Sequence, residues 1–356
     1  MIDALELIVG VLLVLWVLND VFESVVVPRP TPGLRPTTIL TRISWPRWRA
    51  IGLARSGDDR ERFLGQYASL LLVTILVVWI AGLIVGYGLV LAALHSELKP
   101  EPQDIAAAIY FAATSLLTIG FGDIIAMELP ARVIAVVAAA TGLGVVALAI
   151  SFIFSLFASF QRREALVVTL DQRAGAPPSG VQLLETMARK RMRGGLGAMF
   201  GEWERWAAEV LDSHVSYPIL AYFRSTHDNE SWVSAIGAVL DAATLVATTV
   251  EDESYGPARM LIGAGEHLVE DMTNFFRLTH GHECGVEREE FDAARERLRD
   301  AGYTLRDADT SWAQFSDTRS TYADGLNALA RHWAVPPALW VGDRSFLPHN
   351  VHALAR

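Results

Sequence analysis

The chain has 356 residues, of which 52% are hydrophobic, and its mean hydropathy is positive. This length allows about two domains, and the apolar content exceeds that of an ordinary soluble protein, so membrane-spanning segments are expected. The formal net charge of -10 argues against a nucleic-acid partner, because a phosphate-binding surface needs clustered lysines and arginines.

Three segments are long and apolar enough to cross a bilayer as helices, which takes about 20 residues. They cover residues 4–27, 67–94 and 131–160. The first begins near the N-terminus but has neither a basic leading region nor a small-residue cleavage site, so we expect a retained helix within residues 1–27 rather than a cleaved signal peptide. The sequence therefore predicts an all-α membrane protein.

Charges between the spans predict their orientation. An arginine-rich linker occupies residues 28–63, and Arg162 and Arg163 follow the third span, whereas the segment joining the second and third spans is mainly acidic. Positively charged loops stay in the cytoplasm. We therefore expect the N-terminus outside and residues 161–356 inside, in the inner membrane of a bacterial cell. Trp45 and Trp48 lie beside arginines in the linker, a pattern typical of an interfacial helix.

Polar residues near the inner end of the first span need partners. Asn19, Asp20 and Glu23 cluster there, and burying a charge in lipid costs a few kcal/mol. We expect them to pair with linker arginines such as Arg29. A role in sensing pH or ions is the alternative.

A short apolar segment lies between the second and third spans. It reads DIAAAIYFAATSLL and is followed by TIGFGD, and about 14 apolar residues are too few to cross a bilayer. The segment must enter the membrane and return on the same side. Asp104 suits a helix N-terminus, so we expect a helix over residues 104–117 and a loop over 118–123.

Gly120 and Gly122 give this loop a backbone that other residues resist. Glycine adopts left-handed angles readily, and alternating such residues with ordinary ones turns successive carbonyls to one side. Non-helical backbone at membrane depth is tolerated only where protein buries it or where it lines an aqueous path. Carbonyls that bind dehydrated cations meet that condition, and the negative end of the preceding helix dipole assists them.

The TIGFGD segment, placed between two spans, resembles the pore of the potassium-channel family, whose pattern is Thr-Val-Gly-Tyr/Phe-Gly-Asp. The resemblance covers about residues 67–160, so a pore domain is expected over 64–160. It implies a carbonyl-lined K+ filter with an acidic residue at the outer mouth. The filter residues are Thr118, Ile119, Gly120, Phe121 and Gly122, and the outer residue is Asp123.

Three residues differ from those found in many members of the family, although phenylalanine at position 121 is a common variant. Phe121 lacks the hydroxyl that tyrosine provides in many relatives, Leu117 replaces a common threonine, and Thr114 stands where some relatives have a glutamate that bonds the outer aspartate. Inactivation behaviour is therefore not implied. Because one chain supplies one filter strand, a quarter of each carbonyl ring, the resemblance implies a homotetramer.

The third span contains candidate gating residues. The resemblance implies a hinge glycine partway along it, and Gly142 and Gly144 stand there. Apolar side chains continue at four-residue spacing, and Ile150 and Phe154 are the candidates for an apolar gate. The alternative is that these side chains only pack against lipid and the preceding span.

Residues 161–356 are predicted to form an all-α cytoplasmic domain, with helix breaks at Gly194 with Gly195 and at Gly256 with Pro257. The run GGLGAMFG at 194–201 follows a basic helix rather than an apolar strand, so a phosphate-binding loop is not expected. Helices are expected at about 179–193, 202–224, 230–250, 257–280, 286–301 and 307–333.

Possible metal or catalytic residues in this domain have simpler explanations. His227 with Asp228 resembles the pair of metal-dependent phosphohydrolases, but Asp228 and Asn229 suit a helix cap. A second group lacks the spacing that puts ligands on one helix face and is expected in an exposed turn. That group comprises His280, His282, Glu283 and Cys284.

Together these patterns predict a potassium-selective channel subunit that is not an enzyme, needs no cofactor, and has membrane lipid and identical copies as partners. Two alternatives remain open. The cytoplasmic half is a signalling enzyme or sensor coupled to the pore, or the chain belongs to a potassium-uptake transporter. Such transporters carry four unequal pore repeats in one chain.

Overall fold

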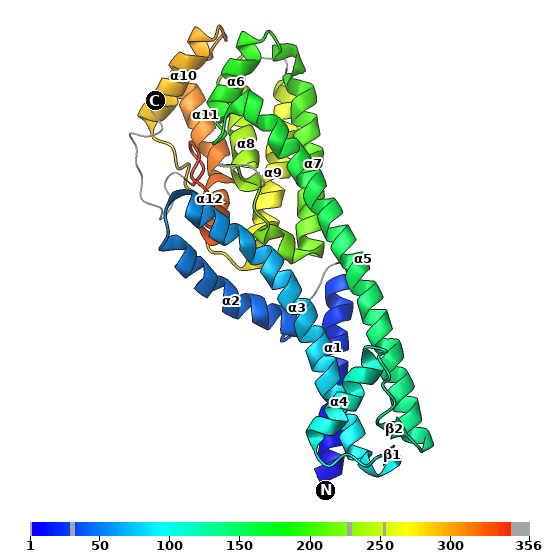
Figure 1. Cartoon of the computed structure of the whole chain (residues 1–356). Coiled ribbons are helices and arrows are strands. Elements are labelled where there is room, and N and C mark those ends of the chain that lie inside the picture. The colour runs from blue at the N-terminus through cyan, green and yellow to red at the C-terminus, as the bar shows by residue number, and fades with distance from the viewer. Residues whose placement is uncertain (1, 29–32, 226–229, 252–253, 343–356) are drawn as a thin grey trace. The chain divides into compact units, whose positions relative to one another are not determined.

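The computed structural model describes residues 2–28, 33–225, 230–251 and 254–342. The protein is an all-α membrane protein, as its apolar segments predicted. It divides into two compact units (Figure 1). The first comprises Met1–Gly52 and Gln66–Ala158, and the second comprises Leu53–Gly65 and Ser159–Arg356.

Three helices are apolar and long enough to cross a membrane: α1 (Ile2–Val25), α3 (Gly57–Ala93) and α5 (Leu129–Ala174). They cover nearly all of the three predicted spans, although α1 ends two residues before residue 27 and α3 ends one residue before residue 94. However, α3 begins well before residue 67 and α5 continues well past residue 160, because hydropathy marks where a helix is apolar and not where its hydrogen bonding stops.

Small residues bring α1 and α3 into close contact. A Cβ added at Gly10 would lie 2.7 Å from the carbonyl oxygen of Gly86, and one added at Gly86 would lie 2.7 Å from a methyl of Val14. Gly82 meets Val17 in the same way, at 2.8 Å. Membrane helices gain no hydrophobic free energy by leaving lipid, so such close backbone packing supplies the contact energy.

Asp20 on α1 is fully buried, and it has partners that the sequence analysis did not name. Its Oδ2 accepts hydrogen bonds from the backbone N–H of Thr37 at 2.9 Å, from the Thr37 hydroxyl at 2.6 Å and from the indole N–H of Trp79 at 2.8 Å. The donors come from the first turn of α2 (Pro36–Leu53) and from α3. These donors are neutral, and Arg29 lies outside the described residues, so the pairing of Asp20 with a linker arginine stays a prediction.

Glu23 does meet a linker arginine. Its carboxylate lies 3.7 Å from the guanidinium of Arg35. Arg29, the partner named from the sequence, lies outside the described residues. Further along the linker, α2 packs on α3 through the rings of Trp45 and Tyr67, whose centroids are 4.8 Å apart.

A two-stranded ladder closes the connection between α3 and α5. Strand β1 (Leu98–Lys99) precedes the short helix α4 (Ile105–Leu116) in the sequence, and strand β2 (Ile125–Ala126) follows it. The two strands pair antiparallel with each other (Figure 1). The Glu97 carboxylate also accepts from the N–H of Ala131 at 2.9 Å. Strands of two residues have no periodicity to detect, so the sequence pattern did not predict them.

The second unit is a helical bundle. Every residue of its helix α8 is buried, and α8 packs against α6, α7, α9, α11 and α12 (Figure 1). Its α-helices are α6 (Gly180–Arg189), α7 (Leu196–Ser216), α8 (Trp232–Thr248), α9 (Tyr255–Phe276), α10 (Arg288–Asp300), α11 (Ala308–Ser320) and α12 (Ala323–Trp333). Among the described residues of the chain, the 3-10 helices are η1 (His95–Glu97), η2 (Arg193–Gly195) and η3 (Pro218–Tyr222).

Several helix boundaries differ from the predicted ones; for example, the helix predicted over 257–280 ends at Phe276. The helix predicted over 202–224 starts at Leu196 and stops at Ser216, because Pro218 cannot continue it and begins η3 instead. The helix predicted over 307–333 is two helices, α11 and α12. The break predicted at Gly256 and Pro257 falls inside the first turn of α9, where proline is tolerated.

A buried ion pair holds the centre of this bundle. Arg319 on α11 donates from Nε to Asp241 on α8 at 2.8 Å, and Tyr322 donates to the same carboxylate at 2.9 Å. Arg319 also donates to the carbonyls of Trp340, at 2.5 Å, and Cys284. Burial alone would lower the pKa of Arg319, but the charge of Asp241 outweighs it and the pKa is raised.

Candidate functional site

The TIGFGD loop, residues 118–123, begins where α4 ends. Asp104 caps α4 by accepting from the N–H of Ala107 at 2.8 Å, as predicted from its position. At the other end, the N–H of Thr118 donates to the Ser115 carbonyl at 3.0 Å, and the N–H of Ile119 donates to the Thr114 carbonyl at 2.8 Å. The last turn of α4 therefore holds the start of the loop.

The loop backbone alternates between two conformations. Thr118, Gly120 and Gly122 have φ angles of 56°, 60° and 81°, whereas Ile119 and Phe121 between them keep negative φ. The sequence predicted left-handed angles at both glycines but not at Thr118. A β-branched residue held there costs about 1–3 kcal/mol, a strain that persists where surrounding structure fixes it.

This alternation makes the loop a candidate cation ligand. It turns successive carbonyls to one side, and in the described part of the chain no hydrogen bond ends on the carbonyl oxygens of residues 118–122. The C-terminal end of α4, which carries the negative end of its dipole, leads directly into the loop. Both features favour a cation at these oxygens.

The apolar side chains of the loop are exposed in the single chain. Phe121 is 69% exposed and Ile119 is 50% exposed. Exposed apolar side chains in a membrane domain face either lipid or another protein chain. The site is therefore open to contacts from outside this chain.

Tyr110 on α4 is a site residue that the sequence analysis missed. Its hydroxyl hydrogen-bonds the carboxylate of Asp123, the last residue of the loop. Thr114, which stands where some relatives have a glutamate that bonds this aspartate, donates to the Phe111 carbonyl at 3.0 Å. The available signal was a tyrosine hydroxyl in a short, mostly apolar helix, because such a hydroxyl needs a partner when it is not in water.

The two candidate hinge glycines lie in different surroundings. A Cβ added at Gly142 would lie 1.9 Å from the carbonyl oxygen of Leu116, at the end of α4, whereas nothing lies within 4 Å of one added at Gly144. Beside this contact, the hydroxyls of Tyr87 on α3 and Thr141 on α5 are 2.8 Å apart. Gly142 therefore lets α5 touch α4 two residues before the loop. The hinge role stays a prediction.

The predicted apolar row on α5 faces away from its own chain. Ile150 is 51% exposed and Phe154 is 73% exposed, while Phe152 and Leu156 on the opposite side are buried. The two gate candidates therefore lie on one free face. Their role in gating stays a prediction.

The other candidates contribute no site that the structure describes. The residues His280, His282, Glu283 and Cys284 lie in the loop between α9 and α10, as predicted. No group of three or more potential metal ligands occurs among the described residues. His227, Asp228 and Asn229 lie outside them.

Comparisons with known proteins agree with this geometry. A family model described as Ion_trans_2, an ion channel, matches residues 73–159, which contain most of α3, all of α4, the loop and the first part of α5. The uncharacterized membrane protein YdjJ of Bacillus subtilis (strain 168) is 21% identical over 219 residues, which are 60% of this chain and 63% of that relative. No solved structure gives a significant match. The chain is a multi-pass membrane protein with an ion-channel domain.

Proposed function

We propose that the protein is one subunit of a homotetrameric, potassium-selective channel in a bacterial cell membrane. The observation that carries this proposal is the alternating left-handed backbone at Thr118, Gly120 and Gly122, directly after a capped re-entrant helix. A ring of backbone carbonyls replaces the hydration shell of K+ in such filters.

Each loop residue has a proposed role. Thr118 supplies the innermost site through its hydroxyl and carbonyl, and Ile119, Gly120 and Phe121 supply further carbonyls. Gly122 closes the outer end. Asp123 stands at the outer mouth, where its hydrogen bond to Tyr110 ties the loop end to α4.

Four copies are needed because one chain offers one such loop. A closed ring of four gives each carbonyl layer its four ligands. The exposed side chains of Phe121, Ile150 and Phe154 fit surfaces that neighbouring subunits or the pore would cover. A transporter with four unequal repeats would need further loops of this kind, and the described residues hold one.

Orientation and regulation complete the proposal. The arginines at residues 28–63 and after residue 160 support a cytoplasmic location for the second unit, because positively charged segments stay on the inner side of the membrane. Because α5 runs without interruption from the first unit into the second, we propose that the second unit regulates the opening of the pore. The protein conducts ions passively and has no catalytic role.

The test is ion flux through liposomes that contain the purified protein. Potassium flux should exceed sodium flux under matched gradients, and Gly120→Ala should abolish it, because the Cβ opposes a φ of 60°. Gly263→Ala is the matched control, since Gly263 lies in α9 with open space around its Cα.

Two results would decide against the proposal. Equal sodium and potassium fluxes that Gly120→Ala leaves unchanged would remove the filter assignment. If the wild-type protein is silent, thermal stabilisation of the tetramer by K+ but not Na+ is the second measurement. If K+ does not stabilise the tetramer more than Na+ does, the filter assignment is also removed.

A further inference from the structure

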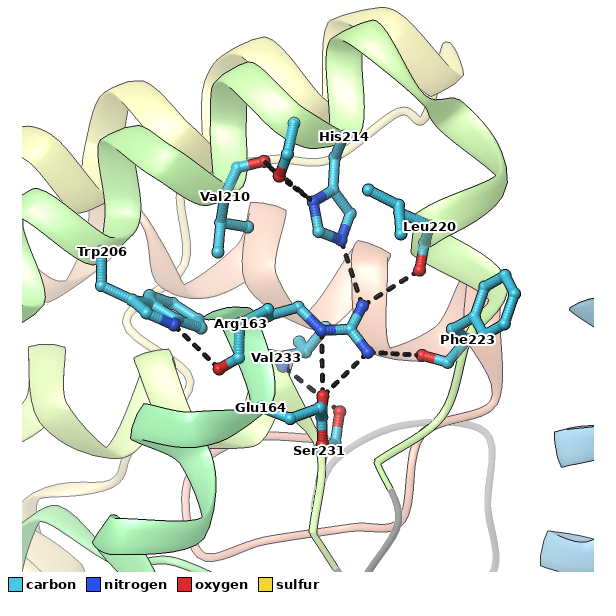
Figure 2. A network of polar contacts seen from close by, with 10 residues as sticks. Arg163, Glu164, Trp206, Val210, His214, Leu220, Phe223, Ser231 and Val233 are labelled. Carbon is cyan, nitrogen blue, oxygen red and sulfur yellow. Dashed lines mark hydrogen bonds and ion pairs between the residues drawn. The ribbon is translucent and has the colours of Figure 1, made fainter. Parts of the chain in front are cut away.

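Arg163 lies on α5 beyond the predicted span, and its side chain is almost wholly buried in the second unit. Its guanidinium donates to the carbonyl of Leu220 at 3.0 Å and to that of Phe223 at 2.8 Å, and it pairs with Glu164 at 2.9 Å (Figure 2). The indole of Trp206 on α7 donates to the Arg163 carbonyl at 3.0 Å. These contacts hold the end of α5 in the bundle.

The segment that contains Leu220 and Phe223 also binds the start of α3. Arg224, which follows Phe223, forms an ion pair with Glu61 on α3 and donates to the carbonyls of Trp333 at 2.8 Å and Ala334 at 2.7 Å. We call residues 220–224 the clamp segment. It binds parts of α3 and α5 that belong to the second unit, and both helices continue into the ion-channel domain.

His214 on α7 completes the contact with Arg163. Its Nδ1 lies 2.8 Å from the carbonyl oxygen of Val210, and its Nε2 lies 3.2 Å from Nη1 of Arg163 (Figure 2). A carbonyl only accepts and a guanidinium only donates. Nδ1 must therefore carry the hydrogen and Nε2 must offer its lone pair, so the observed arrangement requires a neutral imidazole.

The surroundings of the ring favour this neutral form. α5 presents Arg163, whose partner Glu164 faces the guanidinium rather than the ring. α7 itself presents the Ser213 hydroxyl, 3.2 Å from Nδ1. α8 presents the ring of Trp232, with centroids 5.0 Å apart.

Charge and burial act together on the titration of His214. Glu230, before α8, is largely buried, and among the described residues Arg163 is the charged group that acts on the imidazole. Burial first, and the positive charge of Arg163 second, lower the pKa of His214 well below its usual value, while the Val210 carbonyl opposes them weakly.

We propose that His214 is a regulatory proton-binding site, where protonation at Nε2 breaks the bond to Arg163 and loosens the hold of the clamp segment on α5. The ligand is a proton from the cytoplasm, which adds to the Nε2 lone pair and displaces no other group. The effect on conduction rests on the proposed function, because it requires α5 to be the inner pore helix.

The direction of the pH dependence follows from the neutral folded form. When the contact opens, His214 regains its ordinary pKa of about 6.5 and binds a proton more readily than in the closed contact. The closed contact is therefore fully stable above about pH 6.5 and loses stability as pH falls below it.

The experiment compares the full-length wild-type protein with His214→Gln, whose amide oxygen can accept from Arg163 but cannot be protonated. Amide hydrogen exchange is followed by mass spectrometry over residues 159–174 and 206–224, at about pH 7.5 and about pH 5.5. Because both proteins are compared at each pH, the chemical exchange rate cancels. Potassium flux from liposomes is measured over the same range of cytoplasmic-side pH.

We expect the two proteins to exchange alike at the higher pH. At the lower pH the wild-type segments should exchange faster than those of His214→Gln by about threefold or more, and flux should change with pH only in the wild-type protein. His267→Gln should behave as wild type, because that histidine lies exposed on α9. A second non-titrating variant, His214→Leu, should also lose the pH response.

Identical exchange in wild-type protein and His214→Gln at the lower pH would overturn the proton site. A flux response to pH that survives in both variants of His214 would overturn its regulatory role. A wild-type protein that conducts no potassium and whose tetramer K+ does not stabilise would remove the proposed function alone, since the exchange comparison still decides whether His214 binds the proton.

Discussion

Asp241 and Arg319 lie in the interior of the second unit, with their side chains almost completely excluded from solvent. Asp241→Asn would leave the Arg319 guanidinium buried without its counter-charge. Removing one partner of such a pair costs about 3–5 kcal/mol. We expect a large fall in the melting temperature of the purified full-length protein, measured by scanning fluorimetry.

The matched control for Asp241→Asn is Glu296→Gln. Glu296 also pairs with an arginine, Arg299, but both side chains are more than half exposed, at 62% and 56%. Solvent screens such a pair, so its loss should leave the melting temperature nearly unchanged. Equal falls in melting temperature in the two variants would show that burial does not determine how much the Asp241–Arg319 pair stabilises the protein.

At the scale of elements, the contact between α4 and α5 depends on Gly142. Gly142→Ala would drive a methyl into the Leu116 carbonyl, and overpacking of this kind costs about 1–3 kcal/mol. Because the contact lies two residues before the TIGFGD loop, we expect the variant to lose most of its potassium flux.

Gly144→Ala tests whether the loss of flux depends on the position of the substituted glycine or on the loss of any glycine from α5. It adds the same methyl two residues further along α5, where nothing lies within 4 Å in the described chain. We expect this variant to assemble and conduct like the wild-type protein. Flux and the amount of tetramer on size-exclusion chromatography are the measurements, and the reverse order of the two variants would contradict the packing argument.

At the scale of the whole molecule, the bonds that shape the TIGFGD loop all lie in the first unit. They join the loop to Thr114, Ser115 and Tyr110 on α4. A chain that ends after Ala174, the last residue of α5, should therefore keep its preference for potassium over sodium while it loses the pH response assigned to His214.

Liposome flux of the truncated protein, with the full-length protein beside it, checks this expectation. The truncation also removes Arg224, which pairs with Glu61 at the start of α3, so its opening behaviour should change even where its selectivity does not. A truncated protein that is still tetrameric but does not prefer potassium would contradict the independence of the loop.

Much of the first unit could be predicted because its signals are local. The length of an apolar run marks a span, Asp104 marks a helix start, and glycine marks a left-handed backbone. Thr118 could not be predicted in this way. Its left-handed angle results from the alternation imposed around it and from the bond that its N–H donates to Ser115.

The partners of buried polar groups were less predictable. The cost of burying Asp20 in lipid indicated that it needs partners, and no sequence pattern identified Thr37 and Trp79, which are among them. Net charge and hydropathy say that a partner must exist. Which donor reaches the carboxylate depends on how α1, α2 and α3 pack.

The sequence by itself determined that this protein is all-α, that three of its described helices are apolar enough to cross a membrane, and that a short apolar helix leads into a glycine-rich loop. Those properties follow from hydropathy, capping and backbone freedom, which act between near neighbours in the chain. Only the tertiary structure decided that Tyr110 reaches Asp123, that Gly142 rather than Gly144 meets α4, and that Arg163 meets His214. Each of those contacts joins a residue on one element to a residue on another element or in a loop, so the packing of the elements decides which residues meet.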